Sequence, residues 1–202
     1  MNSFLAVFGI AFGTVLLVEL PDKTLVATLV LSTKYRRRPV LLGVATAFAV
    51  QCAIAVTAGG LLRLLPHRAV EGLVALLFAI GAFVLFRESV GGPEDGDGVD
   101  VPAGGPDQLI SDRRVFAISF GVLFAAEWGD ASQLATAGLV ARYGQPVAVG
   151  LGAFLALVGV AVMATVLGRA ILRRVPLKLI HQVAAVVFTA FAIIAAVAAI
   201  RG

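Results

Sequence analysis

Long runs of apolar side chains, separated by short polar segments, are the first pattern in this sequence. The runs cover residues 4–32, 39–65, 69–87, 114–141, 146–171 and 177–200. Each has about the 20 residues that an α-helix needs to cross a hydrocarbon layer of about 30 Å. Charged residues make up only 14% of the 202 residues, against roughly 25% in soluble domains. The pattern predicts an all-α integral membrane protein with six transmembrane helices in a lipid bilayer.

A polar segment rich in Gly, Pro and Asp (GGPEDGDGVDVPAGGPD) separates the third and fourth runs. Such a composition cannot bury enough apolar surface to form a core. We therefore divide the chain into a first three-helix repeat (1–88), a flexible acidic linker (89–112) and a second three-helix repeat (113–202). The first run contains Glu19 and Asp22, so we interpret it as a helix of the mature protein rather than a signal peptide.

The sixteen Lys and Arg residues are distributed unevenly around the predicted helices. One side holds Lys34, Arg36, Arg37, Arg38, Arg87, Arg113, Arg114, Arg169, Arg173, Arg174 and Lys178; the other holds Arg63, Arg68, Arg142 and Arg201, and Lys23 lies inside the first helix. The richer side marks the cytoplasm, which predicts a cytoplasmic linker and both termini outside a plasma or inner membrane. Because the basic residues form short inter-helix segments, they do not indicate nucleic-acid binding.

The first and fourth predicted helices share an acidic motif at an offset of 108 residues, so that Glu19 matches Glu127 and Asp22 matches Asp130. With three helices per unit, the second copy runs in the opposite direction, which predicts two inverted repeats. Inverted repeats place the substrate near the bilayer midplane. One residue out of register, the match continues at Pro39 and Gly43 in the first unit and Pro146 and Gly150 in the second.

Only four of the twelve acidic residues lie deep inside predicted helices, and these are Glu19, Asp22, Glu127 and Asp130. A carboxylate at the centre of a membrane helix costs about 3 kcal/mol, so four would cost roughly 10 kcal/mol unless a function offsets them. Residues three apart on a helix lie about 60° apart around its axis, which gives each helix one acidic face. The two acidic faces meet if the repeats are related by a twofold axis in the membrane plane.

These four carboxylates are the predicted metal ligands, and the predicted lining residues are Lys23, Thr24, Ser132 and Gln133. Donors that are all oxygen suit hard cations such as Ca²⁺, Mn²⁺ or Mg²⁺, while zinc and copper favour His and Cys. Lys23 is either a counter-ion that replaces the metal or a structural partner of Glu19. The cation is a substrate here, and we expect no cofactor and no catalytic residue.

Crowded carboxylates in a low-dielectric site cannot all stay ionised unless a cation is present. They therefore hold either metal or protons, and exposing such a site alternately to each side makes an antiporter. The predicted function is exchange of a hard divalent cation for protons. Pro21 should kink the first helix, Gly129 occupies the matching place in the fourth, and the freed carbonyls can join a metal shell.

Weaker signals are read as structural. Gln51 and Thr57 are expected to bond neighbouring helices. The Gly9–Gly13 spacing favours close packing inside the bundle and leaves a homodimer open. His67 and His181 are expected near the membrane interfaces.

The segments ELPDKT (19–24) and EWGDAS (127–132), the second followed by Gln133, resemble a known family signature. It is the doubled Glu-x-Gly-Asp-Lys/Arg-Thr/Ser motif of the six-helix Gdt-type cation/proton antiporters, which include Golgi calcium and manganese transporters and bacterial manganese exporters. The resemblance covers the whole chain. It implies that the four acids bind the cation and exchange protons, with Thr24, Ser132 and Gln133 lining the site. With this resemblance, we expect export of Mn²⁺, Ca²⁺ or both from the cytoplasm, driven by inward proton movement.

Two residues depart from that signature. Pro21 stands where the first motif usually has Gly, and Ala131 stands where the second usually has a basic residue. The motifs then carry four acids against Lys23 alone, a net charge of −3 where the family has −2. The departures leave ion preference and proton stoichiometry less defined than the fold.

Other classes of protein fit the sequence less well. An amino-acid or other small-molecule exporter of similar helix count should need groups for both ammonium and carboxylate. A membrane-embedded metalloenzyme should show a His ligand set or a nucleophile dyad at mid-membrane depth, and none is evident. A purely structural protein would gain nothing from four buried acids. The sequence does not choose between Mn²⁺ and Ca²⁺.

Overall fold

The computed structural model describes residues 3–19, 23–90, 110–174 and 177–201, which are all helical or in short connections, without strands. The helices are α1 (Phe4–Glu19), α2 (Lys23–Lys34), α3 (Arg37–Leu62), α4 (His67–Val90), α5 (Asp112–Ala126), α6 (Ala131–Tyr143), α7 (Pro146–Arg174) and α8 (Leu177–Arg201). The predicted all-α architecture is confirmed.

Two described segments are individually long and apolar enough to cross a membrane, namely α3 and the part of α7 over Pro146–Val166. The pair α5 and α6 passes the same test as one bent span, with 72° between its two parts. Helix α1 and the Ala185–Arg201 part of α8 are apolar but shorter. The apolar helices expected of a membrane protein are therefore present.

One of the predicted helices is interrupted within the described residues. The fourth run, expected as one helix over 114–141, ends as α5 at Ala126 and resumes as α6 at Ala131, so its prediction as a continuous helix was wrong. The break has a backbone cause, because Gly129 has φ +76° and Asp130 has an extended backbone, neither of which an α-helix permits. In the first run, α1 ends at Glu19 and α2 begins at Lys23, while residues 20–22 lie outside the described residues.

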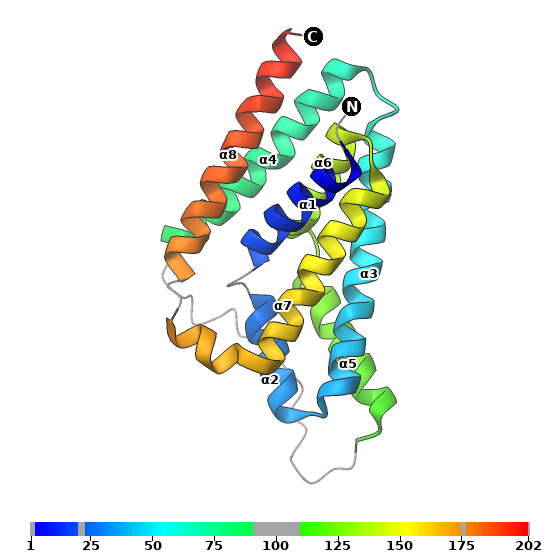
Figure 1. Ribbon diagram of the computed structural model, residues 1–202, viewed down its shortest axis with the longest axis vertical. Helices are drawn as coiled ribbons and strands as arrows, with labels where there is room; N and C mark the ends of the chain where they lie inside the picture. The colour runs from blue at the N-terminus through cyan, green and yellow to red at the C-terminus, as the bar shows by residue number, and fades with distance from the viewer. Residues whose placement is uncertain (1–2, 20–22, 91–109, 175–176, 202) are drawn as a thin grey trace.

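The two ends of the molecule differ in which helix connections they hold. The N- and C-termini lie at one end, the termini end, together with the α3–α4 and α6–α7 connections (Figure 1). The starts of α3 and α5 lie at the other end, the basic end, which carries Arg36–Arg38 and Arg113–Arg114. There Arg36 forms an exposed ion pair of 3.2 Å with Asp112.

The helices of the first half pack mainly on those of the second. Helix α1 packs on α7 as α5 packs on α3, and α2 packs on α7 as α6 packs on α3. The contacts of α3 with α7 and of α4 with α8 join helices at equivalent places in the two halves, whereas α4 also packs on α6 without a described counterpart. Most contacts between the halves thus have a counterpart when the halves are exchanged.

Two glycines show this correspondence at the level of residues. A Cβ atom at Gly43 would strike the backbone of 116–120, and one at Gly152 would strike the backbone of 8–12. These two segments match each other at the offset of 108 residues. In this packing the counterpart of Gly43 is Gly152, and not Gly150 as the sequence match indicated. Glycine permits the close backbone approach at both places.

Aromatic side chains fill the contact between α4 and α8. The Phe78 ring packs edge-on against Phe188, with centroids 5.4 Å apart, and stacks on Phe191 at 5.0 Å. Phe78 and Phe188 are fully buried and belong to one hydrophobic cluster that also includes residues of α1, α6 and α7. The aromatic contacts join α4 and α8 into a single pair, visible as two adjacent ribbons in Figure 1.

Candidate cation site

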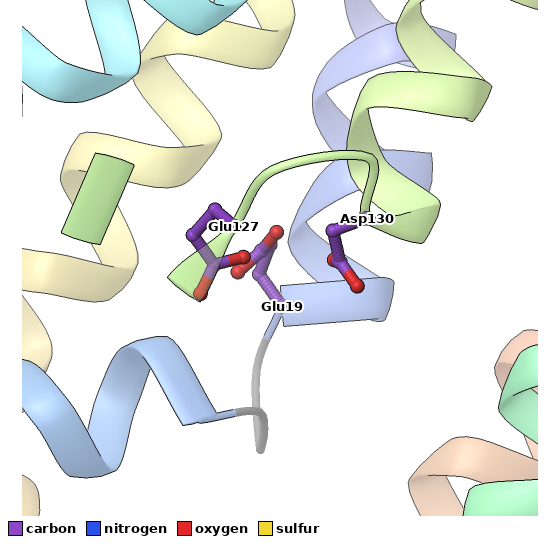
Figure 2. Close-up of side chains that lie close together, drawn as sticks. All are labelled: Glu19, Glu127 and Asp130. Atoms are coloured by element: carbon purple, nitrogen blue, oxygen red, sulfur yellow. The ribbon is translucent and has the colours of Figure 1, made fainter. Parts of the chain in front are cut away.

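Three of the four predicted metal ligands meet inside the helical bundle. Glu19, Glu127 and Asp130 each offer a carboxylate oxygen, and these oxygens all lie within 4.8 Å of one another (Figure 2). Glu19 and Glu127 are essentially inaccessible to solvent, and Asp130 is half-buried. The cluster joins the two halves, since Glu19 comes from the first and the other two from the second.

Helix ends position these carboxylates, as Figure 2 shows. Glu19 is the last residue of α1, Glu127 is the C-cap of α5, and Asp130 is the N-cap of α6. The C-terminal end of a helix carries partial negative charge and favours a cation, while the N-terminal end of α6 favours the Asp130 carboxylate. The helix breaks therefore add backbone charge to the acidic cluster, an arrangement used by ion-coupled transporters.

The break in the second half depends on Gly129. Its φ of +76° lies in the left-handed region, where glycine is favoured. Its backbone N–H donates a hydrogen bond of 3.2 Å to Oε1 of Gln133, a predicted lining residue. The described contact of Gln133 therefore holds the turn that carries Asp130.

Thr24 links the two halves at the site. It is fully buried in the first turn of α2, and its hydroxyl donates a short hydrogen bond to Oε1 of Glu127. Ser132, its match in the second half, is buried in the first turn of α6. Both predicted lining hydroxyls thus lie in the first turn of a helix, and Thr24 contacts an acid of the cluster.

Two predicted site residues remain untested by the geometry. Asp22 lies outside the described residues, so its role as the fourth ligand stays a prediction. Lys23 begins α2, but its side chain also lies outside the description. Whether it is a counter-ion or a partner of Glu19 therefore stays open.

Thr28 is a polar residue one helical turn from Thr24 for which the sequence predicted no role. It is fully buried, and its Oγ1 has no hydrogen-bond partner among the described residues. Residues four apart share a helix face, so Thr28 lies one turn beyond Thr24 on the same face of α2. The four-residue spacing from Thr24 is the signal that could have found it.

The expected helix-to-helix bond of Gln51 is confirmed. Its Nε2 donates a hydrogen bond of 3.1 Å to the backbone carbonyl of Phe124 in the last turn of α5. Thr57 behaves differently from the prediction, because it is exposed and its hydroxyl donates to the carbonyl of Ala53 in its own helix. Gln51 thus supports the helix end that carries Glu127.

The chemistry of the cluster follows from its donors and its charge. Two unit negative charges 4.8 Å apart repel by about 3 kcal/mol at an effective dielectric constant of 20. Each pair in the cluster adds such a term, so full ionisation requires a compensating cation. Carboxylate and hydroxyl oxygens favour hard divalent cations. The site can exchange such a cation for protons.

An apolar helical bundle with a buried acidic site at broken helices defines a membrane cation transporter. Comparison with known proteins supports this class. The family described as "Divalent cation/proton antiporter GDT1" matches residues 7–93 and 115–202. The chain belongs to this family, and it is therefore a membrane transport protein and not an enzyme.

Several curated proteins are similar over nearly the whole chain. A GDT1-like protein of Synechocystis sp. is 31% identical over 185 residues, covering 87% of this chain and 89% of that protein. A Vibrio cholerae protein named "Putative manganese exporter" is 29% identical and covers 94% of this chain and 90% of its own length. GDT1-like protein 5 of Oryza sativa is 27% identical, with 95% and 94% covered. No solved structure matches.

Proposed function

We propose that this protein exports Mn²⁺, and also Ca²⁺, from the cytoplasm in exchange for protons. The observation that carries the proposal is the buried cluster of Glu19, Glu127 and Asp130, which both halves build and which contains only oxygen donors. The family assignment supports cation/proton exchange. The name of the Vibrio cholerae relative supports manganese, and the hard donors suit calcium equally.

The proposed architecture is six spans in two inverted repeats, 1–88 and 113–202, joined by the linker 89–112. Two observations support it: most helix contacts between the halves have a counterpart when the halves are exchanged, and Gly43 and Gly152 pack against matching segments of the two halves. The pairs α1–α2 and α5–α6 are then two broken spans that cross in opposite directions. Their breaks bring helix ends to mid-membrane depth, where the cation binds.

The proposed orientation places the basic end and the linker in the cytoplasm and both termini outside. The positive-inside bias of eleven basic residues to four supports this orientation. The basic residues Arg36–Arg38 at the start of α3 then lie on the cytoplasmic side of a plasma or inner membrane. The start of α5 lies on the same side.

In the proposed cycle, Glu19, Asp22, Glu127 and Asp130 bind the cation from the cytoplasm, with Thr24, Ser132 and Gln133 lining the site. The cation offsets the repulsion among the carboxylates. On the opposite side, protons replace it and neutralise the same oxygens. Because both substrates compete for one set of carboxylates, no cofactor and no separate proton site are needed.

Reconstitution in liposomes with an imposed pH gradient tests this function. We expect the native protein to couple Mn²⁺ flux to opposite proton flux, with Ca²⁺ compared under identical conditions. Glu19→Gln and Asp130→Asn should each reduce coupled flux on the order of 100-fold, because each removes a carboxylate that binds both substrates. Asp112→Asn, which changes an exposed acid at the basic end, is the matched control and should retain flux. Flux that survives both site substitutions would contradict the mechanism.

A further inference from the structure

An ion pair joins α4 to α6 at the termini end. Arg142, in the last turn of α6, lies 2.9 Å from Oε2 of Glu71 in α4. The two side chains are only 21% and 9% exposed, so water screens this pair less than the fully exposed Arg36–Asp112 pair. The pair connects the first half of the chain to the second, outside the acidic cluster.

Close packing strengthens the same contact deeper in the bundle. The ring of Phe78 in α4 lies so near Gly138 of α6 that a Cβ atom there would stand 2.9 Å from the ring edge. Phe78 also packs on Phe188 and Phe191 of α8. Helices α4 and α8 therefore meet the rest of the molecule as one unit, held on α6 by an ion pair and a ring-on-glycine contact.

The described residues show no equivalent contact in the other half. The repeat relates α4 to α8 and α6 to α2, so the counterpart of the α4–α6 contact is a contact between α8 and α2. The described residues show no comparable packing of α8 on α2. The α4–α8 pair instead contacts α1 and α6, the parts of the broken spans nearer the termini end (Figure 1). For α2 and α5, the parts nearer the basic end, the described part of the chain gives no contact of similar size with this pair.

The sequences of α2 and α8 explain why no such ion pair forms there. Helix α2 contains no acidic residue, and neither does α8. Their ionisable side chains are all basic or histidine: Lys23, Lys34, Lys178, His181 and Arg201. Opposite charges thus join α4 to α6 at the termini end, whereas α2 and α8 contain no acid that could form an equivalent ion pair.

We propose that the Glu71–Arg142 contact is the gate between the cation site and the termini end. This inference rests on the proposed antiport function. In this structure the gate is closed, because the ion pair and the Phe78–Gly138 contact are both formed. Release of the cation at the termini end requires α4 and α8 to leave α6, and the repeat relation assigns the opposite gate to α8 and α2.

Distances between spin labels test the gate directly, without requiring transport. Labels at the exposed positions Ala69 of α4 and Val147 of α7, in a Cys52→Ala background, report the distance between the start of α4 and the start of α7, which directly follows α6 in the chain. We expect Glu71→Gln to increase a longer-distance component on the order of tenfold relative to Glu71→Asp, which keeps the charge. Arg36→Gln, which breaks the ion pair at the other end, should leave the distribution unchanged. An unchanged distribution in Glu71→Gln would overturn the proposal.

Reversible cross-linking then connects the gate to transport. In the variant Glu71→Cys/Arg142→Cys, a short bis-thiosulfonate cross-linker should stop Mn²⁺–proton exchange, and reduction should restore it. The control Arg36→Cys/Asp112→Cys should keep exchanging when cross-linked. Exchange that continues with the gate fully cross-linked would refute the gate. A further outcome is that the spin-label distances shift as expected while the native protein shows no cation-coupled flux. That result would support the Glu71–Arg142 contact as a moving contact and would contradict the proposed function.

Discussion

Both halves of the chain end a helix at a glutamate, but the residues that follow this glutamate differ between the halves. In the first half, α1 ends at Glu19 and α2 resumes at Lys23; in the second, Glu127 caps α5 and α6 resumes at Ala131. The sequence between them contains Pro21 in one half and Gly129 in the other. Proline removes a backbone donor, while glycine accepts a positive φ. In the second half a glycine turn thus accompanies the buried carboxylate at the end of the helix, whereas Pro21 at the matching place in the first half lies outside the described residues.

The largest expected effect comes from placing a proline at Gly129, the position in the second half that matches Pro21 in the first. Gly129→Pro should reduce coupled Mn²⁺ flux on the order of 100-fold, since proline fixes φ near −65° and cannot donate the N–H that Gln133 accepts. Flux in liposomes, normalised to the amount of folded protein, measures the loss.

Two further substitutions separate backbone strain from steric contact. A Cβ atom at Gly129 would meet nothing within 4 Å, so Gly129→Ala causes no steric clash. Its only cost, about 1 kcal/mol of folding free energy, comes from placing alanine at a positive φ. Gly129→Asn should approach native flux, because Asn tolerates the left-handed region. If proline and asparagine gave equal flux, the turn would not be what positions Asp130.

The hydroxyls of the two halves are the next point of comparison. Thr24 donates to Glu127, whereas no hydrogen bond to an acid is described for its match, Ser132. We expect Thr24→Val to raise the apparent KM for Mn²⁺ about tenfold, the effect of losing a bond to a charged group worth about 1.5 kcal/mol. Ser132→Ala should raise it less than threefold.

The conservative variant decides whether the hydroxyl itself matters. Thr24→Ser keeps the donor and should restore the KM to within about twofold of the native value. Initial rates of Mn²⁺ uptake at several concentrations give KM and kcat separately. Equal losses in Thr24→Val and Ser132→Ala would show that the described asymmetry between the halves has no functional weight.

Much of the site followed from the sequence because buried charge in lipid is rare and costly. The apolar runs located the helices to within a few residues, and the cost of buried acids singled out Glu19, Glu127 and Asp130 before any geometry was known. Periodicity in apolar residues does not reveal where a helix breaks, however. The expectation of one acidic face per helix failed at Glu127 and Asp130, which lie in a turn.

Contacts between distant segments were the part that the sequence did not provide. Nothing in the local pattern pairs Glu71 with Arg142, which are 71 residues apart, or seats Phe78 on Gly138. The one-residue shift read from Pro39 and Pro146 also misassigned the counterpart of Gly43. Such relations depend on how helices cross, which hydrophobic patterns of similar helices do not specify.

The charge of the two motifs is a further difference between the halves. Ala131 occupies the place of Lys23, but it is buried in the hydrophobic cluster that contains Phe78. We expect Ala131→Lys to raise the apparent KM for Mn²⁺ roughly tenfold, because a positive charge beside Asp130 repels the cation. Binding and uptake are measured in parallel on the same preparations.

A matched control removes the effect of bulk at this buried position. Ala131→Met adds a side chain of similar length without charge, so its KM should stay nearer the native value than that of the lysine variant. Both should lose some stability through overpacking, on the order of 1–3 kcal/mol. Tighter cation binding in Ala131→Lys than in Ala131→Met would contradict the electrostatic argument.

The smallest expected effect concerns a support that only one half possesses. Gln51 of α3 donates a hydrogen bond to the Phe124 carbonyl, one turn before Glu127. In α7 the matching residue is Val158 if Gly43 is aligned with Gly150, and Val160 if Gly43 is aligned with Gly152, and both are apolar. Gln51→Leu leaves that carbonyl without its donor and should lower the free energy of unfolding by about 1 kcal/mol. Thermal unfolding in detergent measures this loss.

Transport by Gln51→Leu should change by less than about threefold, since Thr24 still orients Glu127. Thr57→Val is the control, because Thr57 bonds only a carbonyl described in its own helix and faces outward, so its stability should stay native. Combining Gln51→Leu with Thr24→Val should reduce cation affinity by more than the product of the two single effects, because the carboxylate then loses both supports. Strict additivity would mean that Gln51 stabilises α5 without helping to hold Glu127 in place.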